Sequence, residues 1–426
     1  MGSRPQPAGG SPFFNPGFPC RLRPVPSQFE AESPQAILIT APVKPAGRHL
    51  NGKDREHPPH FRLGEPDPCT PFGWMPAFRR LPSDSNPVFL PLILCPAKSG
   101  TLPSVRKIRF CWWLWMASLS FLISFPPHVD EITSYHFFVR ENWLSVITFY
   151  PMPNNHILTN LVSRILSLLS GEFIFVMRLP TVLISIFCTV FLYLCTLRYT
   201  NFVIATLSVS FFSFTELGLF YTISGRGYYM LLFASFMLFF ATYSLCFSTR
   251  SVRFKWFVWL LAGCIGFYTM PPFLYPFFSA CAVLFLYFIS HKNLHGVKQL
   301  FMAGSLVSLI VMLLYLPIVL VSGFGSLTGN QYVEPMAPGA FWNAFLFFIY
   351  NIERKTNGLN VVGVIIQAVS LVAFFILARR FYRDEHITRL GKMALAFALF
   401  GFVLLPLQQV YPPVRVFLYK GFFLHL

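Results

Sequence analysis

Long runs of apolar residues, separated by short polar segments, fill the chain from about residue 106 onwards. A helix needs roughly 20 consecutive apolar residues to cross a 30 Å hydrocarbon layer, and most of these runs are about that long. The pattern therefore predicts an all-α, polytopic transmembrane domain over residues 106–426. We expect about nine spans, at 108–127, 179–197, 202–221, 228–248, 255–270 (marginal in length), 273–290, 299–321, 360–378 and 392–410.

The apolar run at 157–170 is the exception, because it is short and contains Arg164. Basic residues favour the cytoplasmic side of a membrane. If this run does not cross, three basic segments of the chain all lie inside, and if it crosses, all three lie outside. We therefore interpret it as an interfacial helix within a first external loop, 128–178. The basic segments are 250–255, 292–298 and 379–392.

Residues 1–105 differ from the rest, because they hold 21 of the 35 prolines and show no helical or strand periodicity. Such a composition does not support a packed core, so we expect a disordered, Pro-rich tail. No secretory signal of the usual three-part form begins it. A regulatory or linker extension and a later start of translation, for instance near Met116, both remain open.

Composition narrows the classes of function. The chain is 55% hydrophobic, 18% aromatic and 12% charged, with a formal net charge of +17. The basic residues lie in the tail and in short loops, so positive-inside topology explains them and no nucleic-acid partner is expected. The nine cysteines form no CxxC pair, and five lie inside apolar runs. These five are expected to be core thiols rather than metal ligands or disulfides.

Polar residues able to carry chemistry gather between residues 130 and 180. Asp130 and Glu131 follow Pro126-Pro127, where a helix does not easily continue, so they are expected at the outer edge of the membrane. A carboxylate placed there can take a proton from a hydroxyl nucleophile. The alternative is that these acids simply mark the outer end of a span.

Asn154, Asn155 and His156 open the short interfacial run. Side-chain amides suit helix capping, and an imidazole can bind a metal ion or a substrate oxygen. Glu131 and His156 are the candidate ligands for a divalent cation, although no cofactor is required by the pattern. Capping and anchoring at the interface is the alternative for this group.

Three arginines share one setting, since each is a lone cation at the external edge of an apolar segment. A guanidinium bonds phosphate oxygens bidentately, so cations on this side suit recognition of a lipid phosphate. Gly225 and Gly227 would let a phosphate approach the backbone closely. Snorkelling of the arginines to lipid headgroups is the alternative. The three are Arg178, Arg226 and Arg415.

Other segments and signatures add little. The Gly-rich stretch 322–330 and the amphiphilic run 341–350 are expected on the external side, where they can form a lid. The chain has no Walker A loop, GxSxG or HExxH sequence, and no charge in mid-span of the kind that proton-coupled carriers use.

Four motifs occur in a characteristic order: Asp130-Glu131 with Tyr135, Asn155-His156-Ile157-Leu158, Arg178-Leu179-Pro180-Thr181, and Ser224-Gly225-Arg226-Gly227-Tyr228. In order and spacing they resemble the GT-C membrane glycosyltransferases, in particular the branch of the protein O-mannosyltransferases and lipid A aminoarabinose transferases. The resemblance covers about residues 108–250, and beyond them it rests on hydropathy.

The resemblance implies transfer of a sugar from a polyprenyl-phosphate donor, with inversion, on the non-cytoplasmic face. It implies Asp130 as the catalytic base and Glu131 as its helper or a cation ligand. His156 matches a family histidine, although Ile157-Leu158 replace the prolines that follow it there. The substrate-binding set that it implies is Tyr135, Asn155, His156, Arg178, Arg226, Tyr228 and, less closely matched, Arg415.

We therefore expect a multi-pass glycosyltransferase of a bacterial cytoplasmic (inner) membrane, with its active site on the outer face and the bilayer and a lipid-linked sugar as partners. The sugar and the acceptor stay open. A polytopic transporter or flippase, whose arginines gather anionic headgroups, is the main alternative, and an inactive product of a damaged reading frame is another. Many relatives continue beyond the ninth span, so both a compact and a truncated member are conceivable.

Overall fold

The computed structural model describes residues 125–150, 155–248, 251–329, 334–357, 369 and 385–426. All of them belong to one compact unit, Pro82–Leu426. Over these residues the regular elements are all helical, with no strand. The predicted tail and most of the predicted spans at 108–127 and 360–378 lie outside the described residues.

The prediction of a helical membrane protein is confirmed, but nine spans are not. Within the described part of the chain, five helices are long and apolar enough to cross a membrane, or six if one bent pair counts as a span. They are α6 (Phe173–Tyr199), α9 (Tyr228–Phe247), α11 (Leu274–Ser290) with the short turn before it, α12 (Leu294–Ser322), and α16 (Glu385–Phe400) continued by α17 (Leu404–Gln408).

The predicted span at 202–221 is the bent pair. It consists of α7 (Phe202–Ser213) and α8 (Glu216–Ile223), which meet at an angle of 70°. Thr215 has an extended backbone between them, and its side chain accepts a hydrogen bond from Gly218 N. This N-cap starts a new helix, so hydropathy alone could not locate the break.

The predicted span at 255–270 becomes α10 (Val252–Thr269), which is not among the helices apolar enough to cross. A buried Lys255 lies in its first turn and lowers its apolarity. Lys255 Nζ donates to the carbonyls of Ser244 and Ser248, at 3.0 and 2.7 Å. Because a cation satisfies the exposed carbonyls of a helix end, Lys255 closes the turn between α9 and α10.

Helix α9 is the centre of the bundle, and 83% of its span is buried. It packs against α6, α10 and α11, and on another side against α18 (Leu418–His425). Ring contacts join Phe236 of α9 to Phe422, and Phe239 to Phe423. The burial explains why α9 is apolar all round.

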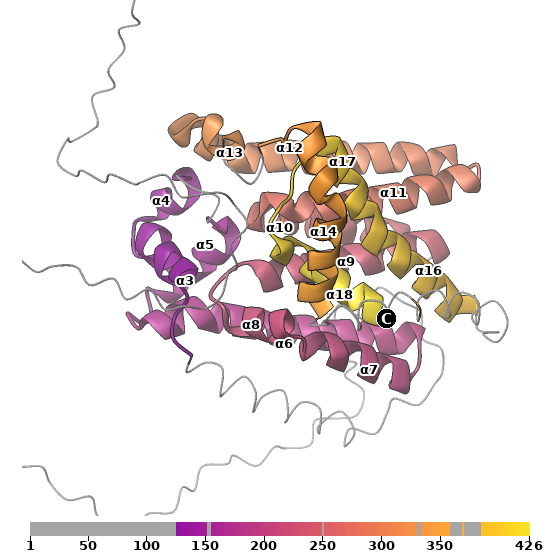
Figure 1. Cartoon of the computed structure of the whole chain (residues 1–426), viewed down its shortest axis with the longest axis horizontal. Helices are drawn as coiled ribbons and strands as arrows, with labels where there is room; N and C mark the ends of the chain where they lie inside the picture. Colours follow the sequence, from indigo (N-terminus) through magenta and orange to yellow (C-terminus); the bar gives the residue numbers. More distant parts are fainter. Residues whose placement is uncertain (1–124, 151–154, 249–250, 330–333, 358–368, 370–384) are drawn as a thin grey trace, which may run out of the picture. The chain divides into compact units, whose positions relative to one another are not determined.

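The first loop forms four short helical elements, grouped at one end of the long helices in Figure 1. The helix predicted at 157–170 is α5, which covers only Ile157–Leu166 and is too short to cross a membrane. Ser322, at the end of α12, donates to the Thr148 carbonyl and accepts from Tyr150 N, which ties the loop to the bundle. The other loop elements are α3 (Val129–Ser134), the π-helix η1 (Tyr135–Val139) and α4 (Trp143–Thr148).

The first loop lies at one end of α9, and Lys255 and Arg389, from two of the basic segments, lie at the other. Tyr228, its first residue, lies edge-on to His156 of the loop, whereas its last residue, Phe247, lies roughly 30 Å further along the helix axis. At that far end the Phe247 ring contacts Arg389 near the start of α16 and Tyr287 near the end of α11. These two basic residues therefore lie away from the first loop.

The predicted lid segments are helical. Residues 325–328 form α13 (Gly325–Thr328), and the run at 341–350 lies within α14 (Pro338–Asn357). Helix α14 packs on α8, on α18 and on the short 3-10 helix η4 (Val414–Phe417), which carries Arg415.

This arrangement predicts the labelling of two engineered cysteines from opposite sides of a membrane. Gly171 precedes α6 and His295 lies in the first turn of α12, and both are exposed. In sealed vesicles of known orientation, an impermeant maleimide should modify Gly171→Cys only from the side of the first loop and His295→Cys only from the other. The unsubstituted chain provides the background, and labelling of both from one side would contradict the arrangement.

Candidate functional site

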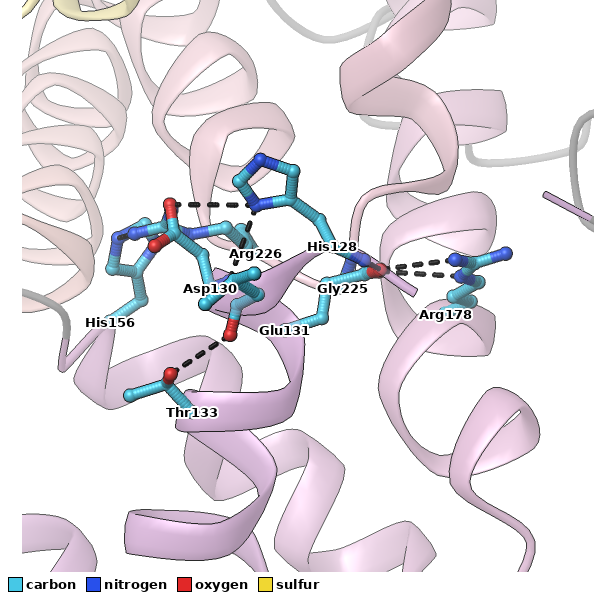
Figure 2. A network of polar contacts seen from close by, with 9 residues as sticks. His128, Asp130, Glu131, Thr133, His156, Arg178, Gly225 and Arg226 are labelled. Carbon is cyan, nitrogen blue, oxygen red and sulfur yellow. Dashed lines mark hydrogen bonds and ion pairs between the residues drawn. The ribbon is translucent and has the colours of Figure 1, made fainter. Parts of the chain in front are cut away.

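Ionisable side chains from four separate segments, four of them charged residues and one a histidine, meet beside the first turn of α3, as Figure 2 shows. The segments are α3 itself, the start of α5, helix α6, and the loop that joins α8 to α9. We call this group the charged cluster, and it consists of Asp130, Glu131, His156, Arg178 and Arg226.

Glu131 is buried, with 1% of its side chain exposed, and its carboxylate is fully engaged. Arg178 donates to both oxygens, from Nε at 3.3 Å and from Nη2 at 3.0 Å. The backbone N–H of Gly225 donates to Oε1 at 2.5 Å, and that of His128 to Oε2 at 2.9 Å. All four of these donors come from the protein, so Glu131 is a structural link rather than a free base.

Arg178 is used in the same way. Besides the two bonds to Glu131, it donates to the carbonyls of Phe125 and Pro126, at 2.8 and 3.3 Å. It joins the chain before α3 to helix α6. In the structure Arg178 therefore holds the loop, and its role near a donor phosphate stays a prediction.

Asp130 points to the other side of the same helical turn and keeps 30% of its side chain exposed. Its Oδ2 is ion-paired with Arg226 Nη1. The imidazole of His128 caps α3, since its Nδ1 accepts from Asp130 N at 3.2 Å, and it lies 3.8 Å from the Asp130 carboxylate. Of the two acids, Asp130 is the one that a second molecule can reach.

His156 is buried and neutral. Burial, together with the Arg415 guanidinium, lowers the pKa of His156 to about 3. Its Nδ1 accepts a hydrogen bond from Gly227 N at 2.7 Å, so the single ring hydrogen is on Nε2. That nitrogen lies 3.0 Å from Arg226 Nη2, which can only donate. Two N–H groups therefore face each other, and an acceptor oxygen beside them would bind both.

The Tyr228 ring contacts both the charged cluster and Arg415. The buried tyrosine ring lies edge-on to His156, with 5.2 Å between ring centroids. The guanidinium carbons of Arg226 and Arg415 lie 5.4 and 6.0 Å from its centroid, within the range of cation–π attraction. Two of the three predicted external arginines thus converge on one aromatic ring.

The glycines on either side of Arg226 do not leave open space for a phosphate, contrary to the sequence-based interpretation. A Cβ on Gly225 would lie 2.8 Å from the Met177 carbonyl oxygen, and one on Gly227 would lie 2.7 Å from Thr269 Cγ2. The missing side chains allow close packing of the loop against α6 and α10, which places the Gly225 N–H at Glu131.

Tyr135 and Asn155 make packing and bracing contacts within the loop, and their contact with substrate stays a prediction. Tyr135 packs its ring edge-on against Phe173, with 5.0 Å between centroids. The buried Asn155 amide donates to the carbonyls of Val146 and Phe149, at 2.9 and 3.0 Å, and accepts from Asn160. It braces the loop, and it does not cap α5, whose N-cap His156 makes no side-chain capping bond.

The candidate cation ligands do not form a metal-binding group. Within the described residues, no three His, Cys, Asp or Glu side chains are placed to hold a metal ion. Glu131 uses both of its oxygens on protein donors, and His156 Nδ1 is occupied by Gly227 N. Of the five cysteines predicted to be core thiols, Cys188, Cys195 and Cys246 are buried, whereas Cys264 and Cys281 are only half-buried.

Several contributors were missed by sequence reasoning. His128 caps the helix that presents both acids, and the capping-box spacing from His128 to Glu131 is a signal that could have found it. Lys420 and Glu353 form a buried ion pair on α18 and α14. The signal in the sequence for this ion pair was Lys420, a lone lysine close to the end of an apolar run.

No protein-family model matches the chain, and no curated protein matches it.

The two neighbouring acids should respond differently to neutralisation. Removing the charge of Glu131 leaves Arg178 buried without its partner, which typically costs about 3–5 kcal/mol. We expect Glu131→Gln to lower the free energy of unfolding by that order, whereas Asp130→Asn should cost less, because 30% of the Asp130 side chain is exposed and water reaches that end of its pair with Arg226. Thermal unfolding in detergent compares them, and equal losses would contradict the assignment of Glu131 as the structural acid.

Acidification should destabilise the fold through His156. Because the folded-state pKa of about 3 lies below the ordinary value of 6.5, the histidine stabilises the fold above pH 6.5. This contribution is lost as pH falls from 6.5 towards 3, at up to about 1.4 kcal/mol per pH unit. His156→Asn should reduce the slope of unfolding free energy between pH 6 and 4 relative to the unsubstituted protein, and identical slopes would show that His156 is not held neutral.

Proposed function

We propose that this protein is a membrane glycosyltransferase with a GT-C-like site, which transfers a sugar from a polyprenyl-phosphate donor to an acceptor at the non-cytoplasmic face, with inversion. The observation that carries the proposal is the position of Arg226, which is paired with the reachable carboxylate of Asp130 and also lies beside His156 Nε2 and over the Tyr228 ring, where Arg415 lies as well. An anion-binding group and a base thus lie side by side.

The donor side supports a phosphate ligand. Three arginines and two carboxylates leave one excess positive charge among these residues, with His156 neutral. A phosphate oxygen beside His156 Nε2 and Arg226 Nη2 would accept from both and relieve the contact between two donors. Arg226 can exchange its bond to Asp130 for one to the phosphate, which leaves the carboxylate available.

The acceptor side requires a base, and Asp130 fits that role. The acceptor hydroxyl oxygen bonds to the anomeric carbon from the face opposite the phosphate, while the bond from that carbon to the phosphate oxygen breaks. Asp130 takes the hydroxyl proton, and the polyprenyl phosphate leaves with the bonding electron pair, its charge stabilised by the guanidinium groups. Because the lipid phosphate is itself a good leaving group, neither a nucleotide site nor a metal ion is a necessary part of this scheme.

The distribution of charge supports the proposed side. Lys255 and Arg389, from two of the basic segments, lie at the far end of α9 from the charged cluster, and basic residues favour the cytoplasmic side. The cluster would then face the exterior of a bacterial cytoplasmic membrane, where lipid-linked sugars serve enzymes of the resembled family.

Replacing the proposed base should abolish transfer without weakening donor binding. In Asp130→Asn, proton transfer is lost, so kcat should fall by about 10²–10⁴-fold while the donor KM does not rise. The measurement is transfer of label from a panel of polyprenyl-phosphate sugars by the purified protein in nanodiscs. Glu172→Gln is the matched control, because Glu172 is an exposed acid in the same loop.

Undiminished turnover of Asp130→Asn would remove Asp130 from the mechanism. If the unsubstituted protein transfers no label from any donor but moves a labelled lipid or solute across the vesicle membrane, the transporter or flippase alternative replaces the proposal.

A further inference from the structure

Arg415 lies on a segment that is fastened to helix α14 on both sides. On the side before it, Met336 N donates to the Gln409 carbonyl at 2.9 Å, just ahead of α14. The Tyr411 ring stacks on Phe341 of α14, with 4.7 Å between centroids, and its hydroxyl donates to the Phe341 carbonyl. These contacts fix the chain four residues ahead of Arg415.

On the side after Arg415, the fastening is ionic. Lys420 Nζ is ion-paired with Glu353 of α14, and the two side chains are 1% and 18% exposed. The ammonium group also lies 4.5 Å from the centre of the Phe402 ring. A buried ion pair is costly to break by removing one partner, because the other charge stays in a poorly solvated place. The pair therefore sets the register between α14 and the start of α18.

The segment between the two fastenings is short, and Arg415 on it reaches the Tyr228 ring. Helix η4 passes directly into α18, so Arg415 and Lys420 belong to one continuous helical stretch. The Arg415 guanidinium lies over Tyr228, whose ring touches His156. We infer that the Lys420–Glu353 ion pair is a positioning element that holds Arg415 against Tyr228 and His156; its effect on catalysis rests on the function proposed above.

A double-mutant cycle tests whether the ion pair acts through Arg415. Glu353→Gln should raise the donor KM by about tenfold, the equivalent of roughly one charge-assisted contact, and leave kcat within about twofold. In an Arg415→Gln background the same substitution should change KM by less than about twofold, because the group it positions is already absent. Equal effects in both backgrounds would indicate a merely structural pair and overturn the inference.

A second measurement does not depend on transfer. The Arg415 charge helps to keep the pKa of His156 low. If Glu353→Gln lets Arg415 move away, the folded-state pKa of His156 rises. The loss of unfolding free energy on acidification that is due to His156, measured as the difference between the protein with His156 and its His156→Asn variant, should then become smaller. An unchanged His156-dependent loss would overturn the inference. A reduced loss in a protein that transfers no sugar would support the positioning role while the proposed function fails.

Two further variants distinguish the positioning role of the ion pair from a general loss of folding. If Glu353→Gln does not fold, Glu353→Gln/Lys420→Met removes both buried charges, which is commonly tolerated. It should still weaken donor binding and the His156 effect, and unchanged values for both would again overturn the inference. The exposed ion pair between Glu385 and Arg389 is the matched control, and Glu385→Gln should change neither measurement.

Discussion

The buried ion pair between Glu131 and Arg178, closed by the N–H of Gly225, is the interaction on which the rest of the site depends. It joins the first loop to α6 and to the loop before α9. Consecutive residues of a helix point about 100° apart, so fixing Glu131 inward turns Asp130 towards Arg226. The exposed acid is thus oriented by its buried neighbour, and the two have different roles although they are adjacent in sequence.

Beside the Glu131–Arg178 ion pair, at His156 and Arg226, hydrogen-bond donors outnumber acceptors. In neutral His156 only Nδ1 can accept a hydrogen bond, and it already accepts one from Gly227 N. The Nε2–H group of His156 and the Nη2–H group of Arg226 therefore face each other as two donors. Such an arrangement is unfavourable by itself and favourable around an anionic oxygen. The proposal of a lipid-phosphate donor follows from this imbalance as well as from the charges.

The bundle keeps its positive loops and its charged cluster apart. Lys255 and Arg389 lie at the end of α9 far from the cluster, where Lys255 satisfies helix-end carbonyls. At the other end, α14 holds the segment of Arg415 through an aromatic stack and a buried ion pair. A rigid support of this kind lets a long arginine side chain hold one place without a large entropic cost.

The sequence by itself determined that this is a helical membrane protein, that the helix after His156 is too short to cross a membrane, and which residues are most of the cluster, because hydropathy and run length are local properties and lone charges beside apolar runs are visible without a fold. Only the tertiary structure decided which acid is buried, since their partners lie 47 and 96 residues away along the chain. It also placed Tyr135 and Asn155 in packing and bracing roles, bent the span at 202–221, and paired Lys420 with Glu353. These outcomes depend on contacts between distant segments, and no local pattern encodes them.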